Sequence, residues 1–230
     1  MKRILTLISC YLFATAYGQG GSTALSFDGN DAVVVAHTAA LTPANSLTVE
    51  AWVFLPSVMA GSQKVVAKFG DVVFNNAYSL EITNGVPVFL IYIEPGAWAG
   101  LGALATLAPN QWHHLAAVYD GAVCRLGVNG EFTQVSLPGT ITPSTATLRL
   151  GSGGAALGGA ERLAGTIDEV RIWNRALTQE EIRHKMTERL TGTEPGLVAY
   201  YRLDEGADNT CPGGQDVCDA SGNGNHGVKF

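Results

Sequence analysis

The feature that most constrains this chain is a series of short segments in which apolar and polar residues alternate with a period of two, as in half-buried strands. The dipeptides Asn84-Gly85, Asp120-Gly121 and Asn129-Gly130 separate several of these segments. They are strong hairpin signals, because a type I′ turn needs a positive φ at both central residues. Strands therefore follow strands without helices between them, which predicts an all-β protein with antiparallel sheets. The predicted strands cover residues 24–27, 47–55, 64–69, 78–83, 86–93, 114–119, 123–128, 147–150 and 167–173.

Composition narrows the class of protein further. The 230 residues include 28 glycines, about 12% of the chain, and this excess over the usual 7% or so suits a sheet protein with many turns. Hydrophobic residues make up 47%, which excludes a disordered chain. The net charge is −6 and there is no basic run, so we expect no nucleic acid as partner. No later segment approaches 18 consecutive apolar residues, so no transmembrane segment is predicted.

Residues 1–18 have the pattern of a secretory signal peptide. Lys2 and Arg3 precede an apolar stretch over residues 4–16, and Ala16-Tyr17-Gly18 is a small-x-small cleavage pattern. The apolar stretch is too short to favour a membrane span. We therefore expect a secreted, extracellular protein; the alternative is a protein that is lipid-anchored through Cys10.

Cys211 and Cys218 enclose a short loop, CPGGQDVC. In an oxidising compartment this arrangement predicts a local disulfide, with two free thiols as the alternative. Cys124 has the same strand parity as Leu126 and Val128, so it is predicted to be a buried apolar thiol.

One short helix is predicted near residues 179–190. Thr178 and Glu181 form a capping box at its start, since Thr is at the N-cap and Glu follows three residues later. Strand patterning resumes over residues 196–204, and a closing strand is expected at about 197–203. Residues 205–230 are polar and rich in glycine, so they are predicted to be an extension held by the cysteine pair.

Four segments, in order, resemble LamG-like jellyroll domains of the concanavalin A-like lectin and glucanase superfamily, a group that includes the laminin G-like and pentraxin-like domains. The resemblance implies a two-sheet antiparallel jellyroll sandwich, here placed over residues 22–204. The matching segments are residues 24–29 (ALSFDG), 47–53 (LTVEAWV), 111–121 (QWHHLAAVYDG) with 127–130 (GVNG), and 165–178 (GTIDEVRIWNRALT).

The end of the chain resembles a lead-in that precedes many such domains. Residues 196–206 (GLVAYYRLDEG) and 219–227 (DASGNGNHG) carry this resemblance, yet here they follow the domain. Either the segment closes the same sandwich, or it begins a second, truncated domain.

Relatives in this superfamily bind glycans, proteins or lipid head groups, and some hydrolyse glycans, so the residues must decide the activity. A retaining glycosidase needs two carboxyl groups about 5 to 5.5 Å apart. The Glu-x-Asp-x-Glu pattern of superfamily glucanases is absent; Glu50 and Glu81 have no partner on their own strand, and Asp168 and Glu169 point to opposite faces. No Gly-x-Ser-x-Gly motif is present. We therefore do not expect an enzyme.

Two regions are candidates for calcium, which binds six to eight oxygen atoms. The resemblance to pentraxins implies loops near Asn75-Asn76 and residues 152–155, but the second loop has no carboxylate, which makes a pentraxin-like site doubtful. The better candidate for one structural Ca²⁺ is the turn at residues 28–31. Its expected ligands are Asp28, Asn30 and Asp31, joined by Asp168 or Asp204 if the terminal strands are adjacent. The alternative is an Asx turn without metal.

Trp98 is the tryptophan that is most available for a ligand. It is in a segment rich in Gly and Pro, whereas three others are in predicted core strands, namely Trp52, Trp112 and Trp173. Sugar sites combine an aromatic platform with a few polar groups. We therefore predict a ligand-binding rim formed by Trp98, Asn75, Asn76 and Glu161; the alternative is a Trp98 folded back to cap the sandwich.

The sequence as a whole predicts a secreted, non-catalytic binding module that recognises carbohydrate or an extracellular protein. The alternatives are a glycoside hydrolase of the same superfamily, and a structural or adhesion module that is a fragment of a multidomain protein.

Overall fold

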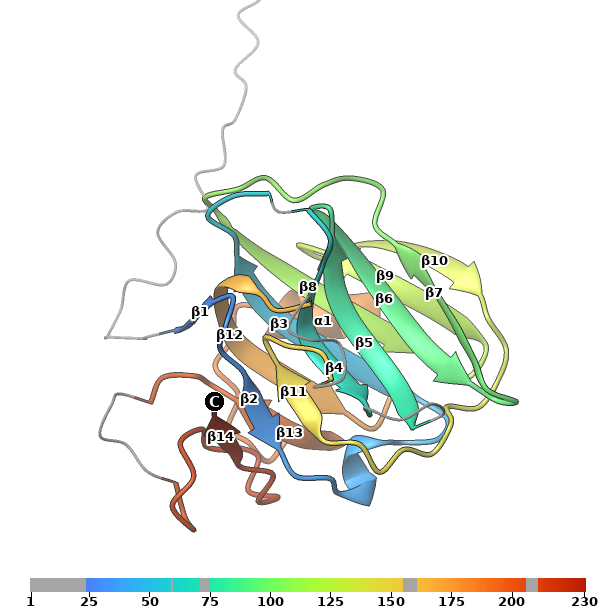
Figure 1. Ribbon diagram of the computed structural model, residues 1–230. Coiled ribbons are helices and arrows are strands. Elements are labelled where there is room, and N and C mark those ends of the chain that lie inside the picture. Colours follow the sequence, from blue (N-terminus) through green and yellow to red (C-terminus); the bar gives the residue numbers. More distant parts are fainter. Residues whose placement is uncertain (1–23, 59, 71–74, 155–160, 206–210) are drawn as a thin grey trace, which may run out of the picture.

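The computed structural model describes residues 24–58, 60–70, 75–154, 161–205 and 211–230. They form a sandwich of two antiparallel sheets with one α-helix (Figure 1), which confirms the predicted all-β jellyroll class. Within these residues no helix is long and apolar enough to cross a membrane.

Seven strands form each sheet. Sheet A has the order β1 (Leu25–Asp28), β12 (Ala164–Trp173), β3 (Leu47–Phe54), β8 (Trp112–Tyr119), β9 (Val123–Val128) and β10 (Glu131–Ser136), and β13 (Leu197–Tyr201) also pairs with β12. Sheet B has the order β14 (Gly227–Lys229), β2 (Val33–Val35), β11 (Leu148–Leu150), β4 (Ser62–Phe69), β5 (Asn76–Thr83), β6 (Val86–Ile93) and β7 (Ala97–Gly102).

The predicted turns are present, with one difference in detail. Asn84 and Gly85 have φ values of 51° and 82°, and Asn129 and Gly130 have 52° and 81°, as a type I′ turn requires. At Asp120-Gly121 only the glycine has a positive φ. There the Asp120 carboxylate accepts the N–H groups of Ala122 and Val123, so the side chain stabilises a different turn.

The main core lies between the two sheets, where every second residue of each strand points inward. Cys124 is in this core as a free, buried thiol, as predicted. Because alternate residues point the opposite way, each sheet also has an outer face, turned away from the other sheet. Representative core residues are Val49, Ala51, Val53, Leu115, Ile167, Tyr78, Leu80, Ile82, Phe89 and Ile91.

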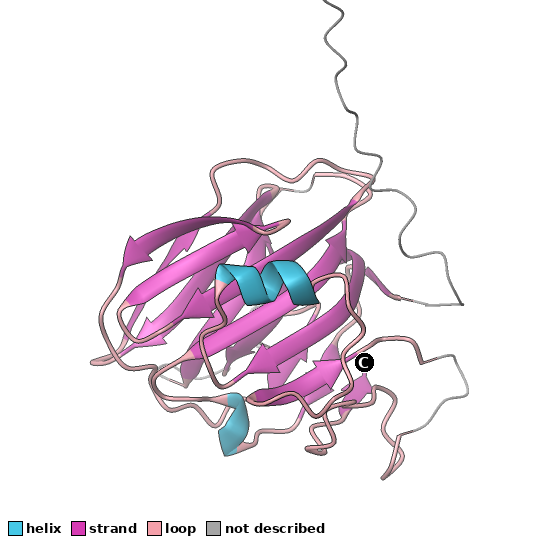
Figure 2. Ribbon diagram, turned by 180° about the vertical axis from the view of Figure 1, so that it is seen from behind, coloured by secondary structure: helices cyan, strands magenta, loops and turns pink. Residues whose placement is uncertain are grey.

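A second, smaller core forms where α1 (Gln179–Lys185) covers the outer face of sheet A (Figure 2). The predicted capping box of Thr178 and Glu181 is present, but the helix ends at Lys185 instead of continuing to residue 190. The Arg171 guanidinium of β12 donates to the carbonyl oxygens of Lys185 (2.7 Å) and Glu188 (2.6 Å). These bonds connect β12 to the last helical residue and to the turn that follows it, where carbonyl groups lack partners within the helix.

The C-terminal segment contributes one strand to each sheet. The predicted closing strand is β13, which pairs with β12, and β14 pairs with β2. The extension predicted over residues 205–230 thus includes one short strand, β14, which alternation did not indicate. The Asp219 carboxylate accepts the N–H groups of Tyr200 in β13 (3.0 Å) and of Asn225 (2.9 Å). Its side chain therefore connects β13 to the segment that leads into β14. The predicted disulfide between Cys211 and Cys218 is formed.

Candidate functional site

The outer face of sheet B carries Trp98, whose side chain is 41% exposed. The sequence predicted this tryptophan in a loop, but it lies on strand β7, directly paired with Tyr92 of β6. The alternation in β6 explains its orientation. Phe89 and Ile91 point into the core, so Tyr92 and its partner Trp98 point outward.

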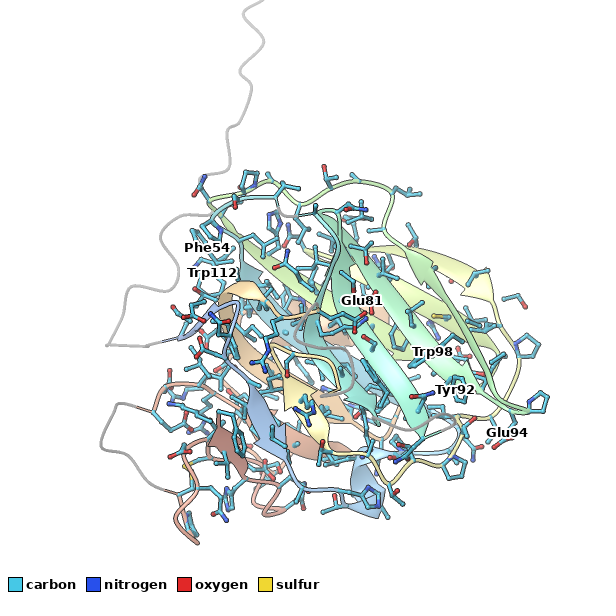
Figure 3. The ribbon with its side chains drawn as sticks, viewed as in Figure 1. Phe54, Glu81, Tyr92, Glu94, Trp98 and Trp112 are labelled. Atoms are coloured by element: carbon cyan, nitrogen blue, oxygen red, sulfur yellow. A yellow bond between two sulfur atoms is a disulfide. The ribbon has the colours of Figure 1, made fainter. Side chains whose placement is uncertain are left out.

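Two neighbouring rings hold Trp98 in place and form with it an aromatic patch, here defined as Phe69, Tyr92 and Trp98. The Trp98 ring meets Tyr92 at a centroid distance of 5.1 Å and Phe69 at 6.0 Å, both in edge-on geometry. Figure 3 shows Trp98 and Tyr92 side by side, near the end of β6 and the start of β7. Edge-to-face contacts are the favoured geometry for aromatic pairs, so the exposed ring is positioned by its neighbours.

Gly100 keeps the strand beside Trp98 clear. Because residues two apart on a strand share a face, Gly100 lies on the same outer face as Trp98. A Cβ atom at this position would lie 1.9 Å from the carbonyl oxygen of Phe89, so no other residue fits without a backbone shift. Trp98 therefore has no side chain beside it at the next outward position of β7, which is Gly100.

A buried ionic group lies on the same face beneath the patch. The Lys64 ammonium contacts the Glu81 carboxylate, is 3.2 Å from Glu161 Oε1, and lies 5.5 Å from the centroid of the Phe69 ring. The Glu81 carboxylate also accepts bonds from the hydroxyl groups of Ser62, Ser79 and Thr83. Lys64 and Glu81 are both buried, and Lys64 connects this group to the patch at Phe69.

These contacts bring together some of the predicted ligand-binding residues. Trp98 and Glu161 are linked through Phe69 and Lys64, and Asn76 pairs with Phe69 at the start of β5. The Asn75 side chain turns elsewhere, because its Oδ1 accepts the backbone N–H of Thr145 (2.8 Å) and the hydroxyl of Ser144 (3.0 Å). Phe69 and Tyr92 were not predicted. Alternation from the inward Val65 would turn Phe69 inward, and the register shifts between β4 and β5 bring it to the outer face. Only the pairing of β4 to β7 places both rings against Trp98.

The residues predicted for calcium fall into separate places. Asp28 Oδ1 accepts the N–H of Asn30 (2.8 Å) and Asp31 Oδ2 accepts the N–H of Asp28 (2.9 Å), which is the geometry of an Asx turn. Asp28 pairs with Ala164, at the opposite end of the β1–β12 pairing from Asp168. In the described part of the chain, no three His, Cys, Asp or Glu side chains gather to hold a metal ion. Calcium binding at the turn stays a prediction.

Asp168 and Asp204 lie near each other on sheet A, away from this turn. Burial, and next the carboxylates of Glu169 and Asp204, raise the pKa of Asp168 to about 7. The Asp204 carboxylate also accepts a bond from Arg189 at 2.7 Å.

The titratable groups on the covered face of sheet A serve the fold. Glu50 Oε1 accepts the indole N–H of Trp173 (2.8 Å), and its Oε2 lies 3.4 Å from Nε2 of His114. His113 points to the opposite side of the sheet, since it pairs with the inward Val53, and its Nε2 is 2.9 Å from the carbonyl oxygen of Ala108. All three side chains are buried.

Trp112 departs from its predicted core position, since 41% of its side chain is exposed. It is at the beginning of β8, paired with Phe54 at the end of β3, and the two ring centroids are 5.7 Å apart. The helix and the residues after it cover the middle of this face, where the Trp52 indole donates to the carbonyl oxygen of Met186. The Phe54–Trp112 pair is the next outward pair along β3 and β8, outside the covered area.

A sandwich of two antiparallel sheets in this order is the fold of the concanavalin A-like class of domain. The chain belongs to the concanavalin A-like lectin/glucanases superfamily, whose laminin G-like family model matches residues 27–183.

Among curated proteins, mouse pappalysin-1 is 38% identical over 85 residues, which is 35% of this chain and 5% of that protein. Among solved structures, a protein from Bacteroides ovatus proposed to bind carbohydrate has a TM-score of 0.70 at 21% identity, covering 90% of this chain and 57% of its own. Domain 4 of AbnA, an extracellular arabinanase from Geobacillus stearothermophilus in complex with arabinotriose, has a TM-score of 0.55 at 19% identity, over 70% of this chain and 75% of that one. A pentraxin from Limulus polyphemus has a TM-score of 0.53 at 15% identity, covering 69% of this chain and 78% of that one. These structural similarities support the fold.

Proposed function

We propose that this protein is a secreted, non-catalytic module that binds a glycan at the aromatic patch of sheet B. The observation that carries the proposal is Trp98, an exposed indole held edge-on by Tyr92 and Phe69 on an outer face of the sandwich. An indole so fixed loses little freedom when a ligand stacks on it, and this lowers the entropic cost of binding. The carbohydrate-related neighbours in fold, including one solved with arabinotriose, support the choice of ligand class.

The chemistry of the patch suits a sugar ring. Aromatic faces bury the C–H surface of a sugar, while nearby polar groups orient its hydroxyls. Glu161, which contacts Lys64 and is not fully buried, has a carboxylate that is an acceptor for hydroxyl donors. An extracellular protein that inserts an apolar side chain is the alternative ligand.

A glycan array tests the proposal. The probes are arabinotriose, xylo-, cello-, laminari- and manno-oligosaccharides, with acidic glycans for comparison. We expect Trp98→Ala to weaken binding to the recognised glycan at least tenfold, which is about 1.4 kcal/mol. Leu104→Ala is the matched control, because Leu104 is also an exposed apolar residue just after β7, at 91% exposure. Equal binding by the wild type and Trp98→Ala would remove Trp98 from the site.

One observation favours a glycan-cleaving enzyme as the second candidate. Glu81 and Glu161 both contact the Lys64 ammonium, so the tertiary structure forms a carboxylate pair that no single strand contains. Against this role, Glu81 is buried and its oxygens already accept bonds from Lys64 and from neighbouring hydroxyls. We expect no release of reducing sugar from any glycan that the array identifies. Release that is lost in Glu161→Gln would establish the enzyme.

Secretion rests on the N-terminal pattern and is supported by the disulfide and by the family. Mass spectrometry of the protein from a culture medium should find an N-terminus after Gly18. A product retained in the membrane fraction, and released in Cys10→Ser, would instead indicate the lipid anchor.

A further inference from the structure

Four side chains form one continuous row on the outer face of sheet A. Ser26 of β1 pairs with Thr166 of β12, Thr166 pairs with Phe54 of β3, and Phe54 pairs with Trp112 of β8. Their neighbours in sequence, such as Phe27, Ile167 and Val53, point into the core, so all four point outward. With strands about 4.8 Å apart, the row is roughly 14 Å long.

The row is divided into an aromatic half and a hydroxyl half. Trp112 and Phe54 lie together, tilted by 53°, and Trp112 is as exposed as Trp98 of the aromatic patch. At the other end, Ser26 Oγ and Thr166 Oγ1 are 3.3 Å apart at the surface. Asp28 follows Ser26 by two residues on the same face and is also exposed. Rings beside hydroxyls and a carboxylate match a sugar, which has an apolar face and hydroxyl edges.

The position of the helical cover leaves this row open. The Trp52–His114 pair forms the adjacent row, and the bond from the Trp52 indole to Met186 marks the cover there. Among the described residues, Phe54 and Trp112 lie outside the small core that the helix forms on this sheet. The helical segment therefore covers the part of this face that carries the ionic groups. The part that carries the aromatic rings and the hydroxyl groups is exposed.

We propose that the row of Ser26, Thr166, Phe54 and Trp112 is a second saccharide-binding site, for a neutral sugar. The sugar stacks on Trp112 and Phe54, and its hydroxyl groups bond to Ser26 and Thr166. The carboxylate of Asp28 accepts hydroxyl donors and repels acidic sugars. This site is on the opposite sheet from the aromatic patch and does not depend on it.

Two sites on opposite sheets make the module bivalent. Figure 3 shows the Phe54–Trp112 pair and the Tyr92–Trp98 pair at opposite ends of the molecule. One glycan chain can then be held at each site, so the module bridges two chains or binds one surface with increased avidity.

Fluorine NMR of the protein labelled with 5-fluorotryptophan reports on each site separately. The four tryptophans give separate resonances, assigned with Trp98→Phe and Trp112→Phe. The probes are the neutral oligosaccharides named above, with galacturonate oligomers as acidic comparison. We expect a neutral probe to shift the Trp112 resonance saturably in wild type and equally in Trp98→Ala. Acidic oligomers should shift it at least tenfold more weakly.

The possible outcomes separate the two sites. A shift of Trp98 alone overturns the second site and leaves the proposed function intact, whereas a shift of Trp112 alone supports the second site and contradicts the role of Trp98. If no saccharide moves Trp112, the second site is wrong, whether or not the row binds a protein.

Variants of the hydroxyl half add a second test. The double variant Ser26→Ala/Thr166→Val keeps the aromatic rings and removes the hydroxyls, so we expect at least a fivefold loss of affinity at Trp112 and none at Trp98. Unchanged affinity at Trp112 would contradict the proposed role of the hydroxyls.

Discussion

The outer faces of the two sheets carry similar residue types and use them differently. On sheet A, α1 and the residues after it cover the centre, and beneath them Glu50, His114, Arg171 and Trp173 are bonded to one another or to the helix. On sheet B, the ionic group of Lys64 and Glu81 supports an exposed tryptophan. A histidine or a carboxylate on a strand therefore indicates nothing about activity until the cover of its face is known.

The strongest way to test the structural role of the covered face is Arg171→Met. Arg171 is 1% exposed and bonds to Glu169 and to the carbonyl groups at the end of α1. Its removal leaves the Glu169 carboxylate without its cation and takes a donor from two carbonyl groups, so we expect a loss of about 4 kcal/mol in the free energy of unfolding. Urea denaturation measures it. Arg183→Met, in an exposed pair with Glu131, should cost less than about 1 kcal/mol.

Lys64→Met tests how much the buried ionic group on the outer face of sheet B contributes to stability. It leaves Glu81 buried without its cation, so we expect a loss of about 3 kcal/mol. The double variant Lys64→Met/Glu81→Met removes both charges and should recover most of that loss, measured in the same urea titration. A double variant as unstable as the single one would show that the pair itself, not the unpaired charge, provides the stability.

Asp168→Asn tests how a carboxyl group at the edge of the covered face changes stability with pH. The pKa of Asp168 is raised to about 7 in the folded protein, mainly by burial and then by Glu169 and Asp204. The unfolded chain therefore ionises first, so this group lowers stability progressively as the pH rises from about 4 to about 7. We expect Asp168→Asn to be more stable than wild type at pH 8, by about 2 kcal/mol after solvent screening, and equal to it near pH 3. Thermal unfolding across this range measures the difference, and parallel pH profiles would contradict the assignment.

The predicted calcium ion should give the smallest effect. A weakly held ion at five times its Kd would stabilise the protein by about 1 kcal/mol, or a rise in Tm of about 2–4 °C. If the turn at Asp28 binds Ca²⁺, EDTA should lower the Tm of the wild type and leave Asp31→Asn unchanged. Identical melting of the wild type with Ca²⁺ and with EDTA would remove calcium from this turn.

Much of the fold was predictable because period-two patterning and turn residues are local signals. β6 and β9 have the predicted bounds, and the capping box of α1 is where the sequence placed it. The short strands β2, β7, β10 and β14 were missed. β2 and β14 have only three residues each, too few for alternation to be visible, and β7 is rich in Ala and Gly, which hide its outward Trp98.

The candidate site was predictable only in part. Trp98 and Glu161 were identified from residue type, but Phe69 and Tyr92 became part of the patch through the pairing of strands distant in sequence. Trp112 shows the reverse case. It was placed in the core by its sequence motif, yet it lies outside the small core that α1 forms on sheet A and is 41% exposed.

The sequence by itself determined the class of fold, the inward and outward parity of most strands, the helix start and the disulfide. Each depends on residues close together in the chain, whose spacing matches the geometry of one element. Only the tertiary structure decided which outward residues are covered and which meet: the centre of sheet A beneath α1, Trp98 against Phe69 and Tyr92, and Trp112 beside Phe54 at an open edge. Burial and contact between distant strands depend on how whole elements pack, and no local pattern records that packing.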